Sequence, residues 1–454
     1  MKKVSALAFA FLFAAACGGA ESEAPPVQPA ASSVEQEGTN APADDEGPIS
    51  DDVLDSAGER FVKLALAIGQ HDPNFVDAYN GPAEWAEEAK ANQTPLADLE
   101  AEAETLFVML DDISAERATI RSSMLRKQVI AARARMRMAG GTQYPFDEET
   151  RLLYDAVAPQ YDVREFHAAL AEIEGLLPGD APLHQRVDDF RNSLAIPEDK
   201  LQVVFDAAIA ECRRRTLGHY TLPEGETFSL EFVKDKPWGG YNWYQGKFES
   251  LIQVNTDFPI IIDRAVDLGC HEGYPGHHTW NVMLERDLLN KKGWIEYSVY
   301  PLFSPLSITA EGSANYGIEL AFPGDEKIAF ERDVLFPLAG LDPEKAQSLV
   351  RLNELRRKLS HSRNHIARLY LDGDIDKEEA IRMGQEFGLQ SRERAEQGID
   401  FIETYRGYVI NYNIGRDLVT GYVARNSEET GDRWGAFETL LTTPLSASDI
   451  AADR

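Results

Sequence analysis

CHEGYPGHHTWN, the sequence at residues 270–281, is the stretch around which the rest of the chain can be interpreted. Three of the nine histidines fall within it, and Glu272 directly follows the first of them, His271. Neutral imidazole nitrogens are good zinc ligands, and a nearby carboxylate can take a proton from an attacking water. The stretch therefore predicts a zinc site with Glu272 as its general base.

The spacing of these histidines departs from the usual helical zinc-peptidase signature, in which two histidines lie four residues apart on one helix face. Four residues after His271 stands Pro275, and the next histidines are His277 and His278. On a straight helix they would lie about 9 Å and about 10.5 Å along the axis from His271, too far to share one zinc. Pro275 and Gly276 predict a break that folds the chain back. Geometry alone leaves both His277 and His278 open as the second ligand.

The third ligand should come from a separate element, and Glu311 is the best candidate. It lies in the sequence ITAEGSANYGIELAF at residues 308–322, which is rich in small residues and predicts a buried helix. A carboxylate in such a place needs a partner, because an isolated buried charge is costly. Asn315 lies one turn after Glu311 and is expected to support it by a hydrogen bond.

These motifs resemble a bacterial family carried as a domain of unknown function (number 885). The similar stretches are HEGYPGHH at 271–278 and AEGSANY at 310–316, with further similarity at 71–82, 239–244 and 405–415. The family is considered related to helical zinc metallopeptidases whose third ligand is a glutamate. The resemblance implies a mainly α, zincin-like fold with one Zn²⁺, and it favours His277 over His278 as a ligand.

The start of the chain is typical of an export signal. Two lysines precede an apolar run at residues 4–16, which is too short to span a bilayer comfortably, and small residues precede Cys17. We therefore expect residues 1–17 to be a lipoprotein signal peptide with Cys17 as the lipidated residue. Ala14 stands where the usual pattern has leucine, so ordinary signal-peptidase cleavage stays open. This places the protein in the cell envelope of a bacterium, lipid-anchored and facing the periplasm or the outer surface.

Composition divides the remaining chain. Residues 18–50 contain almost no large apolar side chains, so we expect a disordered tether. Residues 51–225 show apolar spacing near 3.6 and predict an N-terminal helical region. Residues 226–430 are expected to complete the same catalytic domain with the metal site, and residues 431–454 to form a C-terminal tail.

The charge and the cysteines limit the partners and the redox state. A net charge of −31 argues against nucleic acid and anionic membrane surfaces, so we expect membrane contact only through the lipid anchor. Besides Cys17, the chain has Cys212 and Cys270, which could form a disulfide or remain buried thiols. The expected partner is a peptide or another small substrate, and the sequence leaves the oligomeric state open.

The sequence changes character at residues 226–257. The segments FSLEFV (228–233), WGGYNWY (238–244) and SLIQVN (250–255) predict a short hairpin or sheet near the active site. An edge strand near the metal can hold a peptide by backbone hydrogen bonds. Three residues are therefore candidates for substrate binding: Gly240, Tyr241 and Asn242. A sheet that only packs against the helices is the alternative.

A long amphipathic stretch at residues 349–371 contains His361, Arg363 and His365. The two histidines share a helix face, but no carboxylate is obviously placed to complete a second metal site. Binding of a substrate carboxylate, support of the metal site and a plain surface role remain open. We take His361 and Arg363 as candidate substrate-binding residues.

Further candidates lie in YRGYVINYNIGR at residues 405–416. Tyr405, Arg406 or Tyr412 could donate a hydrogen bond to the oxyanion that forms during hydrolysis, and all three are candidate catalytic residues. Aromatic packing between helices is the alternative.

Together these features predict a zinc-dependent hydrolase, most naturally a metallopeptidase. His271, His277 and Glu311 would hold the Zn²⁺. Glu272 would take a proton from the attacking water and pass it to the leaving amine. Two other classes stay open: a non-catalytic metal-binding lipoprotein, which would need no Glu272, and a structural envelope lipoprotein whose histidines hydrogen-bond in the core. The sequence leaves open where in a peptide the bond would be cut.

Overall fold

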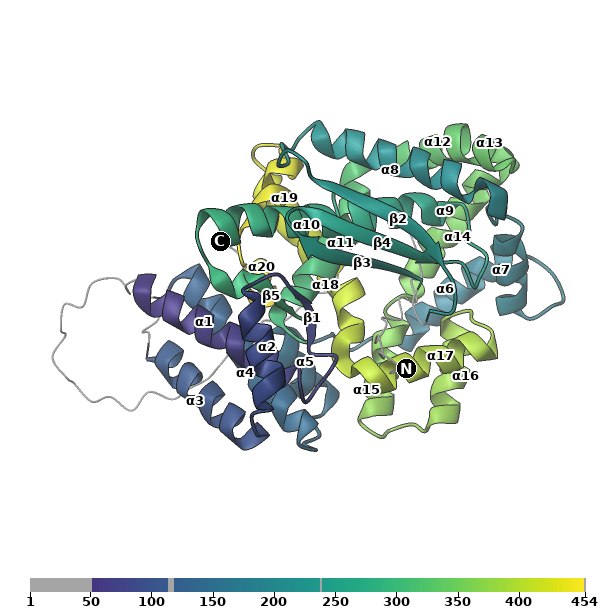
Figure 1. Ribbon diagram of the computed structural model, residues 1–454. Helices are drawn as coiled ribbons and strands as arrows, with labels where there is room; N and C mark the ends of the chain where they lie inside the picture. The colour runs from purple at the N-terminus through teal and green to yellow at the C-terminus, as the bar shows by residue number, and fades with distance from the viewer. Residues whose placement is uncertain (1–50, 113–117, 237–238, 453–454) are drawn as a thin grey trace, which may run out of the picture.

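A computed structural model describes residues 51–112, 118–236 and 239–452 of the chain. The predicted signal peptide, Cys17 and the predicted tether lie outside these residues. Helices dominate the described part, and its strands form two small sheets (Figure 1). This confirms the prediction of a mainly α protein with a small sheet. Among the described helices, none combines the length and the apolar character needed to cross a membrane.

The region before residue 225 is built mostly from helices, as the apolar spacing predicts. Local capping fixes several of their ends: the Thr119 hydroxyl accepts a hydrogen bond from the Ser122 N–H at the start of α4. The helices are α1 (Asp51–Ile68), α2 (Ala83–Asn92), α3 (Leu96–Asp111), α4 (Ile120–Ala139), α5 (Phe146–Tyr154), α6 (Val163–Leu176), α7 (Leu183–Asn192), η1 (Glu198–Lys200) and α8 (Leu201–Leu217).

Two small sheets interrupt the helices. β1 (Val76–Tyr79) pairs antiparallel with β5 (Val299–Pro301). β1 departs from the prediction of a helical N-terminal region, since four residues are too few to show an alternating pattern. The second sheet has the order β2-β4-β3, with β2 (Thr227–Val233) parallel to β4 (Glu249–Asn255) and β3 (Gly240–Gly246) antiparallel to β4.

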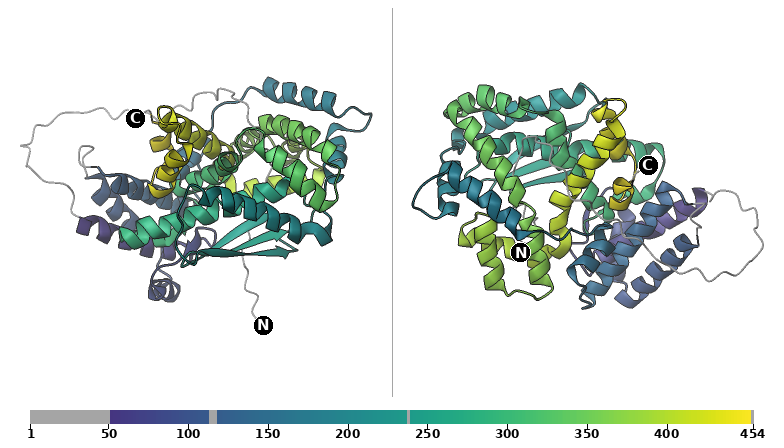
Figure 2. Two further views of the ribbon diagram at one scale, coloured as in Figure 1. Left: turned by 90° about the horizontal axis from the view of Figure 1, so that it is seen from above. Right: turned by 180° about the vertical axis from the view of Figure 1, so that it is seen from behind.

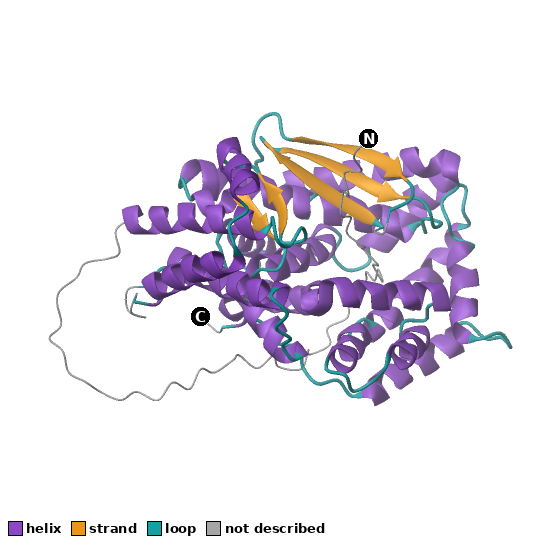
Figure 3. Cartoon of the chain, turned by 60° about the horizontal axis from the view of Figure 1, so that its bottom comes forward, coloured by secondary structure: helices purple, strands orange, loops and turns teal. Residues whose placement is uncertain are grey.

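The three-stranded sheet lies at the periphery of the protein, with helices packed on one face (Figures 2 and 3). Alternate residues of β4 are buried against these helices, among them Ile252 and Val254. This is the period-2 pattern of a strand with one face in the core. β3 is an edge strand and packs against the segment that carries His271.

The middle of the chain carries the predicted metal-binding residues. Its elements are α9 (Asp263–Leu268), η2 (Gly269–Gly273), α10 (His277–Leu284), η3 (Glu285–Lys291), η4 (Ile295–Ser298), α11 (Pro305–Ala321), α12 (Glu326–Phe330), η5 (Glu331–Leu335), α13 (Phe336–Ala339) and η6 (Pro343–Lys345). α11 is buried over almost its whole length, as its composition predicts.

The C-terminal part is helical throughout. Its elements are α14 (Ala346–Leu359), α15 (Ser362–Leu371), α16 (Lys377–Phe387), α17 (Arg392–Tyr405), η7 (Arg406–Val409), α18 (Ile410–Ser427), α19 (Arg433–Thr442) and α20 (Ala447–Ala451). The last two helices lie in the stretch for which the sequence suggests only a tail. They pack into the core through Leu440, Leu441 and Ile450.

α11 and α18 cross at a glycine contact in the centre of the protein. A Cβ atom on Gly312 would lie 2.3 Å from the carbonyl oxygen of Gly415. Only glycine lets two backbones approach this closely. The contact holds α18 against the helix that carries Glu311.

Candidate metal centre

His271 and Glu272 enter the core at the end of one continuous helical segment. α9 runs directly into η2, a π-helical turn in which the Tyr274 N–H donates to the Gly269 carbonyl at 3.2 Å. The side chains of His271 and Glu272 are buried. The wider π turn lies at the point where the two side chains must face inward, and such turns are frequent at functional sites.

The predicted break follows at Pro275 and Gly276, and the structure confirms it. The Tyr274–Pro275 peptide is cis, and α10 begins at His277. A Cβ atom on Gly276 would lie 1.9 Å from the carbonyl oxygen of His271, so the turn admits only glycine. The chain folds back tightly enough to place the His271 and His277 rings 4.7 Å apart between centroids.

His277 and Glu311 complete a group with the geometry of a metal site. The Nε2 atoms of His271 and His277 lie 3.5 Å and 3.8 Å from Oε2 of Glu311. All three ligand atoms lie within 4.8 Å of one another. Ligands about 2.0–2.2 Å from one tetrahedral zinc lie roughly 3.3 Å from each other, so small adjustments would close the site on an ion.

His278 lies on the other side of α10 and is bonded elsewhere. Its Nδ1 atom is 2.8 Å from the Ser250 hydroxyl, and its Nε2 atom is 3.0 Å from Oε2 of Glu226. Both ring nitrogens therefore serve contacts with the β2–β4 side of the fold. The structure brings together the set with His277 and not the alternative set with His278.

The carboxylate of Glu272 is buried beside this group. Neither of its oxygens has a hydrogen-bond partner among the described residues. Burial raises the pKa of Glu272, although the nearby His271 and His277 oppose the shift. For Glu311, by contrast, burial is outweighed by the nearby His271 and His277, which lower its pKa to about 2. The pKa values of the two carboxylates are therefore shifted in opposite directions. The raised pKa of Glu272 suits a proton acceptor, and the lowered pKa of Glu311 suits a charged metal ligand.

Two hydrogen bonds fix the position of Glu311. The Tyr408 hydroxyl donates to Oε1 of Glu311 at 3.0 Å, which leaves Oε2 facing the histidines. Asn315 donates from Nδ2 to the backbone carbonyls of Glu311 and Tyr412, at 3.0 Å and 3.2 Å. Asn315 therefore supports the site by joining α11 to α18. It bonds to the backbone of Glu311 and not to its carboxylate.

Asp77 of β1 also lies at the site, although the sequence did not identify it as a candidate. Its carboxylate accepts a hydrogen bond from the Tyr241 hydroxyl and lies close enough to His277 and Glu311 to interact with their charges. Burial raises the pKa of Asp77 to about 6. Asp77 and Tyr408 both fall in stretches of family resemblance, which was the signal available for finding them.

The predicted strand residues lie beside Glu272. Asn242 donates from Nδ2 to the backbone carbonyl of Glu272 at 2.6 Å. A Cβ atom on Gly240 would lie 3.3 Å from Oε1 of Glu272, so the strand passes very near the carboxylate. Tyr241 reaches Asp77 from the same strand. The sheet thus lies at the site, as the sequence predicts.

The three candidates from residues 405–416 have different surroundings. Tyr412 is half-buried with its hydroxyl enclosed near Glu311 and Glu272, and burial holds its pKa well above the ordinary value, so it stays a hydrogen-bond donor. Burial raises the pKa of Tyr405 to about 12. Arg406 instead donates from Nε to Oε2 of Glu149 at 2.6 Å. Arg406 is thus paired with a residue of α5. Tyr405 and Tyr412 are better placed to donate a hydrogen bond to the oxyanion.

A disulfide between Cys212 and Cys270 joins α8 to η2. The sequence left this pairing open. The bond fixes the residue directly before His271, and it fits a protein of an oxidising compartment.

Comparisons with known proteins add little. No protein-family model and no curated protein matches the sequence, so the family resemblance stays a prediction. One solved structure, of a candidate lipoprotein from Colwellia psychrerythraea, matches 89% of this chain and 76% of its own at 14% identity and a TM-score of 0.49. Another, of a candidate lipoprotein of unknown function from Shewanella oneidensis, matches 81% and 75% at 11% identity and a TM-score of 0.44. Neither likeness carries an argument.

The chemistry of the site follows from its own side chains. Two imidazoles and one carboxylate suit a borderline metal such as zinc, and three protein ligands leave a fourth position open, as catalytic zinc sites do. The buried carboxylate of Glu272 stands next to that group with no competing bond among the described residues. The arrangement can bind a divalent ion and move a proton at the same place.

Proposed function

We propose that the protein is a zinc-dependent hydrolase that cleaves peptide bonds. The observation that supports this most is the buried Glu272 beside the His271, His277 and Glu311 group. A site that only stores or carries a metal needs the ligands but has no use for an additional carboxylate without a hydrogen-bond partner in the described structure. Such a carboxylate is costly to bury unless it has a task.

In this proposal each side chain has one role. Zinc held by the three ligands would act as a Lewis acid that polarises the scissile carbonyl. Glu272 takes the proton of the attacking water, and its raised pKa suits both this step and the later transfer to the leaving amine. Tyr412, and less directly Tyr405, donates to the developing oxyanion.

The edge strand β3 supports a peptide as the substrate. It passes beside Glu272 and ends the three-stranded sheet, so an extended chain could add to it by backbone hydrogen bonds. Gly240 leaves room at the closest point. A zincin-like arrangement and attachment to the bacterial envelope through Cys17 belong to the same proposal, and they rest on the sequence motifs.

The test is metal analysis and peptide hydrolysis on four forms of the chain: wild type, His271→Ala, Glu272→Gln and His167→Ala. We expect about one zinc per wild-type chain and loss of zinc in His271→Ala. Glu272→Gln should keep the zinc and lose about 10³-fold in hydrolysis, because it can no longer accept the proton. His167 is exposed on α6, where it contacts Glu386 and Phe387 instead of the metal-site residues, so His167→Ala serves as the control for the zinc measurement.

Two outcomes would overturn the proposal. If the wild-type chain neither holds zinc nor takes it up, the protein is better explained as a structural lipoprotein. Zinc retained with no hydrolysis of any peptide in a diverse library would indicate a metal-binding lipoprotein without catalysis.

A further inference from the structure

A cavity of about 160 Å³ is lined in part by residues from the helices that carry the metal centre. Three of its lining residues connect it to that centre. Asp267 lies one helical turn before His271, Asn315 lies one turn after Glu311, and Tyr412 is the proposed oxyanion donor. A molecule bound at the metal centre could therefore extend into this space.

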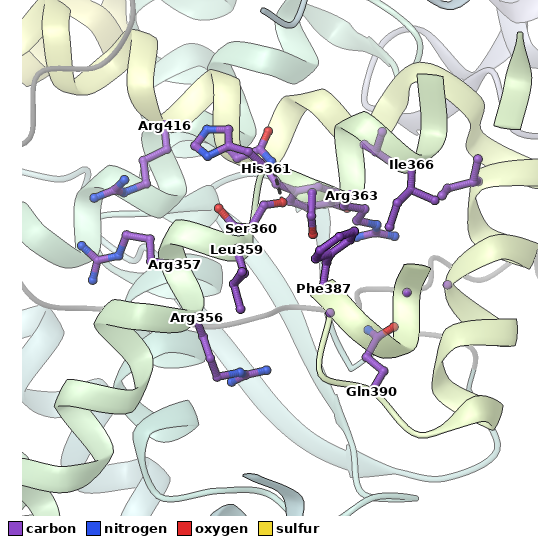
Figure 4. Close-up of a pocket in the computed structure, with 18 of the residues that line it drawn as sticks. Arg356, Arg357, Leu359, Ser360, His361, Arg363, Ile366, Phe387, Gln390 and Arg416 are labelled. Carbon is purple, nitrogen blue, oxygen red and sulfur yellow. Dashed lines mark hydrogen bonds between the residues drawn. The ribbon is translucent and has the colours of Figure 1, made fainter. Parts of the chain in front are cut away.

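Arginines dominate the charge of the cavity. Four of them line it, contributed by α14, α15 and α18, and Figure 4 labels each: Arg356, Arg357, Arg363 and Arg416. Two acidic side chains, Asp267 and Asp417, also line the cavity, and Arg416 pairs with Glu319 of α11 and lies 3.5 Å from Asp417. Asp267 lies 3.0 Å from Lys327 Nζ, and Asp417 lies 2.9 Å from His361 Nε2.

The positive charge of Arg356, Arg357 and Arg363 contrasts with the net charge of the whole chain, which is −31. A cleft of one sign with low-dielectric walls concentrates ions of the opposite sign. An acidic protein that gathers arginines in one cavity therefore favours an anion there and repels anions elsewhere.

Arg356 lines the cavity with a guanidinium that is only partly hydrogen-bonded. Its Nη1 atom is buried without a hydrogen-bond partner among the described residues. Burial, together with the positive charge of Arg191, lowers the pKa of Arg356 to about 9, although Asp263 and Asp188 oppose the shift. A guanidinium in this state would be stabilised by an incoming anion, and its planar fork fits a carboxylate.

Another part of the cavity wall is apolar. Phe387, Ile399 and Ile402 line it, and the nearby Gly384 and Gly398 carry no side chain into the space. Arg363 itself stacks over the Phe401 ring at 4.4 Å. The site thus offers positive charge next to apolar surface, which suits a peptide and is poorly suited to a small inorganic ion.

We propose that this cavity binds a carboxylate of the peptide substrate, through Arg356 and Arg363, while the scissile bond lies at the metal centre. The preferred substrates would then carry either a free C-terminus or an acidic side chain close to the cut bond. This inference rests on the proposed peptidase function and adds the substrate class to it.

The test measures binding separately from catalysis. The probes are an N-acetylated pentapeptide with one glutamate and a free C-terminus, its C-terminal amide, its glutamine analogue and the analogue with both changes. Calorimetry on the full chain with Glu272→Gln gives their Kd values. We expect Kd to rise about tenfold or more when the recognised carboxylate is removed. The amide and the glutamine analogue show which carboxylate that is.

Substitutions locate the contact. Arg356→Gln should remove the discrimination between the acidic and the neutral peptides. Arg351→Gln should keep it, because Arg351 lies on the same helix but outside the cavity, paired with Glu172 and Glu354. Arg363→Gln is a second cavity variant, which also loses the contact with Phe401. If the Arg363→Gln variant does not fold, Arg356→Gln alone decides the test.

The outcomes separate this inference from the proposed function. The cavity assignment is overturned if all four peptides bind equally, or if a folded Arg356→Gln chain still discriminates between them. This holds even if the wild-type chain hydrolyses peptides. Arginine-dependent binding without hydrolysis by the wild type would keep the cavity assignment and overturn the peptidase.

Discussion

Tyr408 donates its hydroxyl hydrogen to Oε1 of Glu311 at 3.0 Å, while both proposed histidine ligands approach Oε2 of the same carboxylate. Oε1 of Glu311 therefore accepts the supporting hydrogen bond, and Oε2 faces the proposed metal position. Burial holds the pKa of Tyr408 well above the ordinary value, so the hydroxyl remains a donor. Such supporting bonds orient metal ligands.

We expect Tyr408→Phe to weaken zinc binding roughly 10- to 100-fold, because Glu311 loses the bond that turns Oε2 toward the histidines. Competition with a chromophoric chelator measures the change. Tyr154→Phe is the matched control: Tyr154 is equally buried next to Tyr408, and its hydroxyl has no partner among the described residues. Equal zinc affinity in the two variants would show that the Tyr408 bond does not support the site.

Tyr412 should act on the reaction and not on the metal. We expect Tyr412→Phe to keep the zinc and to lower kcat by about 10²-fold with a smaller change in KM, since its hydroxyl would meet the substrate oxygen only as charge develops. Steady-state kinetics and metal content are measured on the same preparation. A kcat within a factor of two of the wild type would move the donor role to Tyr405.

The sequence was sufficient for the local features of the site. Pro275 and Gly276 predicted the break, and the small residues around Glu311 predicted the buried helix. The spacing alone left His277 and His278 open, and only the family resemblance favoured His277 before the structure showed their directions. Neighbouring residues on a helix point about 100° apart, and only the direction of α10 shows that His277 faces Glu311 while His278 faces Glu226.

Features that depend on distant parts of the chain could not be predicted. Asp77 reaches the site from a four-residue strand paired with β5, and such a pairing leaves no local pattern. Arg406 is a candidate catalytic donor by its sequence, and its hydrogen-bond partner Glu149 comes from α5, far away in the chain. The tight packing of Gly312 on Gly415 likewise depends on two helices far apart in sequence.

The disulfide should contribute to stability through the unfolded chain. Cys212 and Cys270 are 58 residues apart. Closing a loop of this length in the unfolded state corresponds to about 4 kcal/mol in the chain-entropy description. We expect Cys212→Ser with Cys270→Ser to lower the free energy of unfolding by that order, as measured by urea denaturation.

Reduction of the wild type provides the control for the two substitutions. Dithiothreitol should lower the stability of the wild-type chain toward that of the double variant and leave the variant unchanged. Equal stability of oxidised wild type and double variant would show that the bond does not restrict the unfolded chain.

Gly276→Ala should remove the turn between the two histidines. The new Cβ atom would lie 1.9 Å from the His271 carbonyl oxygen and 2.4 Å from that of Cys270, both backbone atoms inside the core. We expect loss of zinc binding and a fall of several kcal/mol in the free energy of unfolding. Gly175→Ala is the control, because a Cβ atom there meets no neighbour within 4 Å. Zinc binding at wild-type affinity in Gly276→Ala would contradict the proposed turn.

Glu331 should make stability depend on pH. Burial raises its pKa to about 7 from 4.5, although Lys327 lies 2.8 Å away and opposes the shift. Between these values the folded chain holds a proton that the unfolded chain has lost. The stabilisation is therefore complete below pH 4.5 and is lost as the pH rises through about 7.

We expect the free energy of unfolding of the wild type, relative to Glu331→Gln, to fall by about 3 kcal/mol across this window. Urea denaturation at several pH values between 4.5 and 8 measures it, and subtracting the variant removes the contributions of other titrating groups. Glu344→Gln, at an exposed position, should run parallel to the wild type. If the difference between wild type and Glu331→Gln is constant over the whole range, Glu331 is ionised in the folded chain and Lys327 outweighs its burial.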